Sequence, residues 1–178
     1  GYFLLLTLAP QAQVLSASFE EWNRPVEHPE VGANRLYIPK IKLNIDYEAG
    51  GPEVLNEKSW WRYPERGNPV EGGNFILSAH RFELGFTPGQ TIRKSPFFHL
   101  NRVQPGDKVY VDYEGKRYEY TIEKRFDVKP TQVEIEAPSE EHKLTIYTCM
   151  LEGQDAGREV LVAKQTRKDV SPEEGLEN

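Results

Sequence analysis

The stretch DKVYVDYEGKRYEYTIEKRFDV, residues 107–128, has the clearest structural pattern in the chain. Val109 and Val111 alternate with more polar residues, and Tyr118 and Tyr120 do the same after the turn sequence YEGK. A period of two is typical of a half-buried β-strand, and a short loop with glycine is typical of a hairpin. This stretch therefore predicts two antiparallel strands.

Further strands are expected on both sides of this hairpin. They lie in RLYIPKIKLNIDYEAG (35–50, two strands separated at Pro39), GGNFILSAH (72–80), TQVEIEAP (131–138), KLTIYTC (143–149) and REVLVAKQ (158–165). Single helical turns are expected in residues 52–61 and 95–103, and a loop in residues 81–96. About eight evenly spaced strands with few helical windows predict a mainly β fold, a closed or nearly closed antiparallel-rich barrel with a few short helices.

Composition excludes several classes of function. The 178 residues carry a net charge of −6 without a basic stripe, which argues against nucleic acid as a partner. A single cysteine excludes an internal disulfide, and it argues against a multi-cysteine zinc site or an iron–sulfur cluster. The four histidines lack the short spacing of metal ligands. We therefore expect no metal and no cofactor.

The N-terminal sequence GYFLLLTLAP is apolar but too short to cross a bilayer, which takes ~20 apolar residues. We interpret residues 1–34 as the end of a membrane anchor or signal segment followed by a linker; a short helix packed on the domain is the alternative. Residues 35–165 are predicted to form the barrel, and residues 166–178 a charged C-terminal tail.

Three polar residues lie at the ends of predicted strands. Alternation places Cys149 on the face opposite Leu144 and Ile146, the expected core side. His80 ends its strand where the chain enters a loop, and Arg158 begins one after a glycine. Each residue alone is compatible with a purely structural role, since free cysteine is often buried and a histidine often bonds to backbone.

Together, these three residue types suggest acyl transfer. A cysteine attacks as its thiolate, and an imidazole can take or hold the thiol proton. A fixed cation near the thiol can stabilise an oxyanion. Three strand ends of one barrel can meet at a single cleft, although periodicity does not show that they do.

The same segments resemble a known family. TIYTC at 145–149 resembles the TLxTC signature of sortases, with isoleucine in place of the usual leucine. SAH at 78–80 resembles the end of the sortase histidine strand, where glycine commonly precedes the histidine. GREVLVAK at 157–164 resembles the strand that opens with the family's arginine. RLYIPKIKLNIDY and SPFFHLNRVQPGDKVYV are similar to other sortase segments, so the resemblance keeps its order over residues 35–165.

The resemblance implies a sortase-type closed eight-stranded barrel and a membrane-anchored cysteine transpeptidase. Carried over by residue, Cys149 is the nucleophile and His80 the general acid and then base. Arg158 hydrogen-bonds the substrate backbone or the oxyanion, and Thr148 helps to shape the oxyanion site. The enzyme is expected on the outer face of the cell membrane of a Gram-positive-type envelope. It would cleave LPxTG-like sorting signals of surface proteins and pass the acyl group to a peptidoglycan precursor or a pilin lysine.

Other interpretations stay open at this point. Papain-like and NlpC/P60-like peptidases place cysteine before histidine, the reverse of the order here, and the caspase sequence QAC is absent. A non-catalytic envelope β-barrel with an idle thiol is the main alternative. Residues 11–30 are long enough to lie across the cleft and inhibit it. Some sortases bind calcium through loop carboxylates, and the acidic residues 133–142 are the place for such a site, although a charged run is usually solvated.

Overall fold

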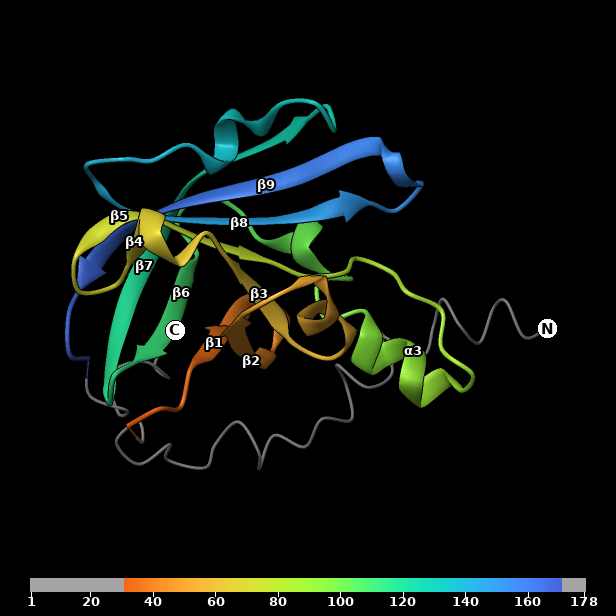
Figure 1. Cartoon of the computed structure of the whole chain (residues 1–178), viewed down its shortest axis with the longest axis horizontal. Coiled ribbons are helices and arrows are strands. Elements are labelled where there is room, and N and C mark those ends of the chain that lie inside the picture. Colours follow the sequence, from red (N-terminus) through yellow and green to blue (C-terminus); the bar gives the residue numbers. More distant parts are fainter. Residues whose placement is uncertain (1–30, 171–178) are drawn as a thin grey trace.

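The computed structural model describes residues 31–170, which form a β-barrel with one short helix at its side (Figure 1). Its strands are β1 (Arg35–Ile38), β2 (Leu43–Ala49), β3 (Ser59–Arg62), β4 (Gly67–Asn68), β5 (Gly72–Ser78), β6 (Lys108–Tyr113), β7 (Lys116–Val128), β8 (His142–Met150) and β9 (Gly153–Arg167). Its helices are α3 (Pro88–Lys94) and the 3-10 turns η1 (Pro39–Ile41), η2 (Pro52–Asn56), η3 (Pro64–Arg66), η4 (Leu100–Arg102) and η5 (Val133–Glu136).

The strands form one sheet in the order β3-β2-β1-β6-β7-β9-β8-β5-β4. Pairing of β3 with β5 closes eight of these strands into a barrel, and β4 is a two-residue extension on β5. Most neighbours are antiparallel, but β2–β3 and β5–β8 are parallel. The predicted closed eight-stranded barrel is therefore confirmed.

Inward-facing side chains of all the long strands fill the barrel. The fully buried residues include Leu36, Phe75, Val109, Ile146 and Leu161. Burying such side chains supplies most of the driving force for the fold, at about 1.5–3 kcal/mol for each large aliphatic or aromatic residue.

Three aromatic rings hold the closure of the barrel together. Tyr47 of β2, Trp61 of β3 and Phe75 of β5 pack edge to face, with ring centroids 5.4–6.0 Å apart. Edge-to-face contact is the favoured geometry of aromatic pairs, because the positive ring edge meets the negative face. The seam between β3 and β5 is thus closed by packing as well as by hydrogen bonds.

Most of the predicted elements are present. Two strands separated by a turn at Pro39, the hairpin at residues 113–116, and helical turns η2 and η4 are all confirmed. The strand expected at residues 131–138 is wrong, because this segment contains the 3-10 turn η5. The eighth barrel strand is instead β3, which follows η2.

The loop expected at residues 81–96 contains helix α3. The side chain of Thr87 accepts a hydrogen bond from the backbone N–H of Gln90 and caps the first turn, with Pro88 at the start of the helix.

At the other end of the described chain, Val170 packs on Tyr37 and Tyr110. The predicted anchor and linker in residues 1–30, and residues 171–178 of the predicted tail, lie outside the described residues.

Candidate active site

Strands β5, β8 and β9 bring the predicted site residues to one end of the barrel. Cys149 and Arg158 are direct register partners in the antiparallel pair β8–β9. In the parallel pair β5–β8, the last partners are Ser78 and Tyr147, and His80 and Cys149 each lie two residues further along. Because parallel strands end at the same edge of a sheet, the histidine and the cysteine emerge side by side.

Cys149 is half-buried and lies on the outer face of the barrel wall, as alternation predicts. Leu144 and Ile146 of the same strand point into the core, while Tyr147 packs with Ile76 and Val160 in a separate cluster outside the barrel. The pairing of β8 with β9 shifts register directly after Cys149. Such an irregularity bends a strand and re-aims its side chains.

His80 follows the end of β5 and is also half-buried. Its backbone carbonyl accepts a hydrogen bond from the N–H of Phe97, at 3.1 Å. The carbonyl of Ala79, one residue earlier, accepts a hydrogen bond from the hydroxyl of Thr148, at 2.8 Å. The backbone on which the imidazole sits is therefore held to β8 and to the segment after α3.

The side chain of Thr148 is turned towards the barrel interior, away from the face of Cys149. It is 1% exposed, and the next residue, Cys149, lies on the other side of the strand. Thr148 is predicted to help shape the oxyanion site. Its hydroxyl is hydrogen-bonded to the backbone carbonyl of Ala79.

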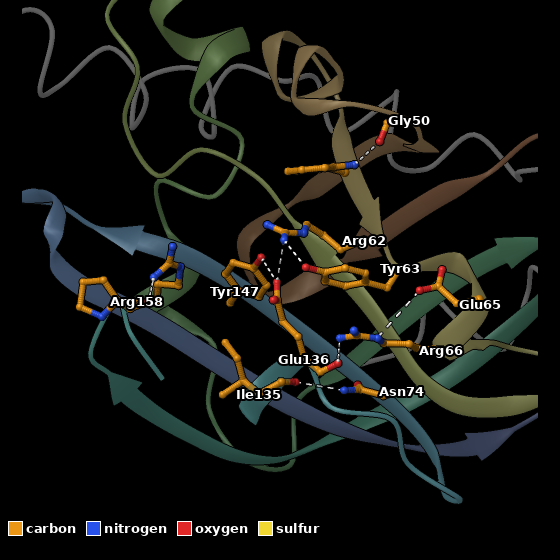
Figure 2. A network of polar contacts seen from close by, with 12 residues as sticks. Gly50, Arg62, Tyr63, Glu65, Arg66, Asn74, Ile135, Glu136, Tyr147 and Arg158 are labelled. Atoms are coloured by element: carbon orange, nitrogen blue, oxygen red, sulfur yellow. Dashed lines mark hydrogen bonds and ion pairs between the residues drawn. The ribbon is translucent and has the colours of Figure 1, made fainter. Parts of the chain in front are cut away.

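Arg158 is held from two directions (Figure 2). Its Nη1 donates to the carbonyl oxygen of Pro130 at 2.9 Å, and its guanidinium carbon lies 5.9 Å from the centre of the Tyr147 ring. An arginine has five N–H donors, so one bond to Pro130 uses only part of this capacity. The guanidinium of Arg158, whose Cα is the register partner of Cys149, is thus held by a bond that uses only one of its donors.

The segment between β7 and β8 is tied down by the network drawn in Figure 2. The carboxylate of Glu136 accepts a hydrogen bond from the Tyr147 hydroxyl at 2.5 Å and lies 3.4 Å from Nη2 of Arg62. Arg66 donates to the carbonyl of Glu136 at 2.6 Å. Burial, and then the bond to Glu136, raise the pKa of the Tyr147 hydroxyl well above its usual range.

Asn74 of β5 also binds the segment between β7 and β8. Its amide donates to the carbonyls of Ile135 and Ala137, at 3.0 and 2.8 Å, and its oxygen accepts from the hydroxyl of Thr145. In a β-strand, these two carbonyls would instead have accepted hydrogen bonds from a neighbouring strand. The bonds from Asn74 keep the segment over the outer face of β5 and β8, with Pro130 next to Arg158.

This arrangement combines a thiol, an imidazole and a guanidinium on one edge. It can attack a carbonyl carbon, move a proton to or from the departing or entering group, and stabilise negative charge on oxygen. The model of the sortase domain matches residues 36–166 of the chain. The chain belongs to the sortase family.

Individual sortases show the same relationship. Over 140 residues, 76% of the chain, it is 30% identical to sortase A of Streptococcus agalactiae serotype III (strain NEM316), and it spans about half (51%) of the length of that relative. The sortase C1 structure of Streptococcus agalactiae in complex with MTSET is 25% identical, with a TM-score of 0.63 over 91% of this chain and 88% of that one.

Two further structures share the fold at lower identity. The structure of Listeria monocytogenes sortase A has a TM-score of 0.65 at 19% identity, over 77% of this chain and 88% of that one. The Clostridium perfringens sortase D5 transpeptidase has a TM-score of 0.63 at 22% identity, over 88% and 93%. At such identity the likeness shows the sortase barrel and no more.

Sequence patterns did not predict the roles of some residues around the sortase site. Glu136 falls in a segment predicted to be a strand, and no pattern links it to Tyr147. Arg81 and Glu159 form a buried ion pair at 2.7 Å directly beneath the site. Alternation could have predicted the ion pair. It places Glu159 on the same core-facing side of its strand as Leu161, where a buried charge needs a partner.

Among residues 31–170, no group of three or more His, Cys, Asp or Glu side chains is placed to hold a metal ion. In the acidic stretch 133–142, the carboxylate of Glu136 is engaged by Tyr147 and Arg62. No helix in the same part of the sortase chain is both long and apolar enough to span a membrane. Residues 11–30, whose inhibition of the cleft is one of the alternatives above, lie outside the described residues.

Proposed function

We propose that this sortase is a cysteine transpeptidase that acts through a thioester on Cys149. The observation that carries the proposal is the direct pairing of Cys149 with Arg158, with His80 at the end of the adjacent parallel strand. Membership of the sortase family supports the same reaction class.

In the first half-reaction, the thiolate of Cys149 attacks the carbonyl carbon of the substrate's scissile peptide bond. The carbonyl oxygen becomes an oxyanion, to which the guanidinium of Arg158 donates a hydrogen bond. His80 gives its proton to the departing amine as the C–N bond breaks, which leaves a thioester on the sulfur.

In the second half-reaction, an amine attacks the thioester carbonyl. His80 takes a proton from the attacking amine, a new amide bond forms, and the C–S bond breaks to regenerate the thiolate. Arg158 stabilises the second oxyanion as it did the first. The proposed reaction uses neither a metal nor a cofactor. His80 gives up one proton in the first half-reaction and takes one in the second, so it returns to its starting state.

The proposed substrates are surface proteins with LPxTG-like C-terminal sorting signals, cleaved between threonine and glycine. The proposed acceptor is a peptidoglycan precursor or a pilin lysine, and the proposed location is the outer face of the cell membrane in a Gram-positive-type envelope. Membership of the sortase family supports these proposals in general, and the related sortase C1 of GBS Pilus Island 1 supports the pilin acceptor.

Intact-protein mass spectrometry tests the proposal. The protein is incubated with a small library of LPxTG-like peptides, beside a Cys149→Ala control. We expect an adduct on the native protein alone, equal in mass to the acyl fragment and removed by hydroxylamine. The peptide that remains attached identifies the sorting motif.

The same experiment separates this proposal from a barrel with an idle thiol. Absence of any adduct, combined with slow alkylation of Cys149, would favour the non-catalytic barrel. Absence of an adduct with a rapidly alkylated Cys149 would instead reject the peptides tested as substrates. His80→Ala is expected to abolish transfer from these peptides to an added amine.

A further inference from the structure

A buried ionic bridge joins the residues that directly follow two of the proposed site residues. Nη1 of Arg81 lies 2.7 Å from Oε2 of Glu159, and Arg81 follows His80 while Glu159 follows Arg158. Arg81 is 9% exposed and Glu159 only 4%. The bridge therefore links the β5 end of the site to β9 through the barrel interior.

Each end of the bridge has a second anchor. Nε of Arg81 donates to the carbonyl of Phe98 at 3.1 Å, and Oε1 of Glu159 accepts from Nε of Arg125 at 3.1 Å. These bonds are directional and charge-assisted, so they define the orientation of both side chains. Glu159 faces Thr148 across β8–β9, next to Cys149.

The bond from Thr148 to the carbonyl of Ala79 completes the arrangement. Residues directly before Cys149 and before His80 are joined by this hydrogen bond, and residues directly after His80 and after Arg158 are joined by the ion pair. All these contacts lie on the interior side, while the three proposed site residues project outward.

Stability alone does not account for a buried ion pair in this position. Apolar side chains of similar volume usually fill such a site at equal or lower free energy, because removing two charges from water is costly. An ion pair differs from an apolar filling mainly in fixing the relative position of the groups it joins.

We propose that Arg81 and Glu159 are positioning residues, which hold His80 and Arg158 in register with Cys149. This inference rests on the proposed function, because it assigns the purpose of the bridge to that reaction. Loss of the bridge should impair the chemical step more than the binding of the peptide.

The decisive variant replaces both partners at once, Arg81→Met with Glu159→Leu, so that no unpaired charge stays buried. We expect a folded protein whose kcat falls by about 10- to 100-fold while KM changes little. The buried bidentate pair Asp112–Arg117, at 2.7 and 2.9 Å, offers a matched control. The double variant Asp112→Leu with Arg117→Met should leave kcat unchanged.

The control pair lies at the opposite end of the barrel. Strand β7 pairs with β9 through Val128 and Arg158 at the site end, whereas Asp112 and Arg117 adjoin the distal hairpin. A general loss of rigidity would affect both double variants. A loss of positioning affects only the pair beneath the site.

A second readout needs no peptide: the rate of alkylation of Cys149 by iodoacetamide, measured against pH. In the Arg81/Glu159 double variant we expect this profile to move from that of the native protein towards that of His80→Ala. A native profile and native kcat in the folded double variant would overturn the inference. If the native protein formed no acyl-enzyme, the proposed function would fail, but the alkylation profile would still test the coupling.

Should the double variant not fold, Glu159→Asp takes its place. The shorter side chain keeps the charge but withdraws its carboxylate from Arg81 and Arg125. A smaller shift of the alkylation profile in the same direction supports positioning, and an unchanged profile contradicts it.

Discussion

At the scale of single residues, the hydroxyl of Thr148 shows how closely the site depends on the barrel interior. It is fully buried and donates to a carbonyl of the strand that leads to His80. The side chain that precedes the proposed nucleophile is thus used to hold the neighbouring strand, while Cys149 projects to the outside.

Thr148→Val keeps the shape of this side chain and removes its donor. We expect the free energy of unfolding to fall by about 1–3 kcal/mol, because the carbonyl of Ala79 loses a buried hydrogen bond. Urea denaturation measures the change. Thr148→Ser keeps the hydroxyl and should retain most of the hydrogen-bond contribution; equal losses in both variants would show that the hydroxyl is unimportant.

At the scale of elements, the segment between β7 and β8 depends on a glycine within β9. Gly157 directly precedes Arg158 and has φ +126°, in a region that side chains rarely adopt. A Cβ at this position would lie 2.7 Å from the carbonyl oxygen of Val128, two residues before Pro130. The close approach of these strands places the Pro130 carbonyl within reach of Arg158.

Gly157→Ala should therefore destabilise the fold for two reasons, backbone strain and the clash with Val128. Gly153→Ala is the matched control, because this residue has φ +118° in the same strand with nothing within 4 Å of its Cβ position. We expect about 1–3 kcal/mol of strain in both variants and a larger loss in Gly157→Ala. Thermal or urea denaturation measures both, and identical losses would contradict a role for the contact.

The elements also show what could be predicted from the sequence. Alternation correctly gave the hairpin of β6 and β7 and the outward orientation of Cys149, because one face of each strand meets the core. It failed at residues 131–138, where Asn74 and Arg66 bind the carbonyls that a strand would have used. It missed β3, because adjacent Trp60 and Trp61 show no alternation.

At the scale of the whole molecule, several polar residues are buried outside the hydrophobic interior. Glu119 of β7 is 5% exposed and accepts hydrogen bonds from the Thr166 hydroxyl, at 2.8 Å, and from Lys108, at 3.4 Å. Burial alone would raise its pKa, but the bond from Thr166 and the charge of Lys108 outweigh burial, so the net pKa of Glu119 is lowered from 4.5.

A lowered pKa in the folded state means that ionised Glu119 stabilises the protein above the unfolded pKa of 4.5. This contribution is lost as pH falls through the lower folded value. We expect native protein and Glu119→Gln to differ most in urea stability at neutral pH, and to converge in acid. A difference that is constant from neutral pH into acid would refute the link to ionisation.

The parallel pairing of β5 with β8 also governs how the molecule is made. It joins residues 73–78 to residues 142–147, and the pairing of β8 with β9 completes the same edge. Contacts between segments so far apart in sequence give a high contact order, which makes folding slow because a long loop must close before the contacts are gained. A nascent chain therefore cannot bring Arg158 opposite Cys149 until β9, the last strand of the barrel, has been synthesised and paired. Under the proposed function, catalysis is thus delayed until the whole barrel is complete.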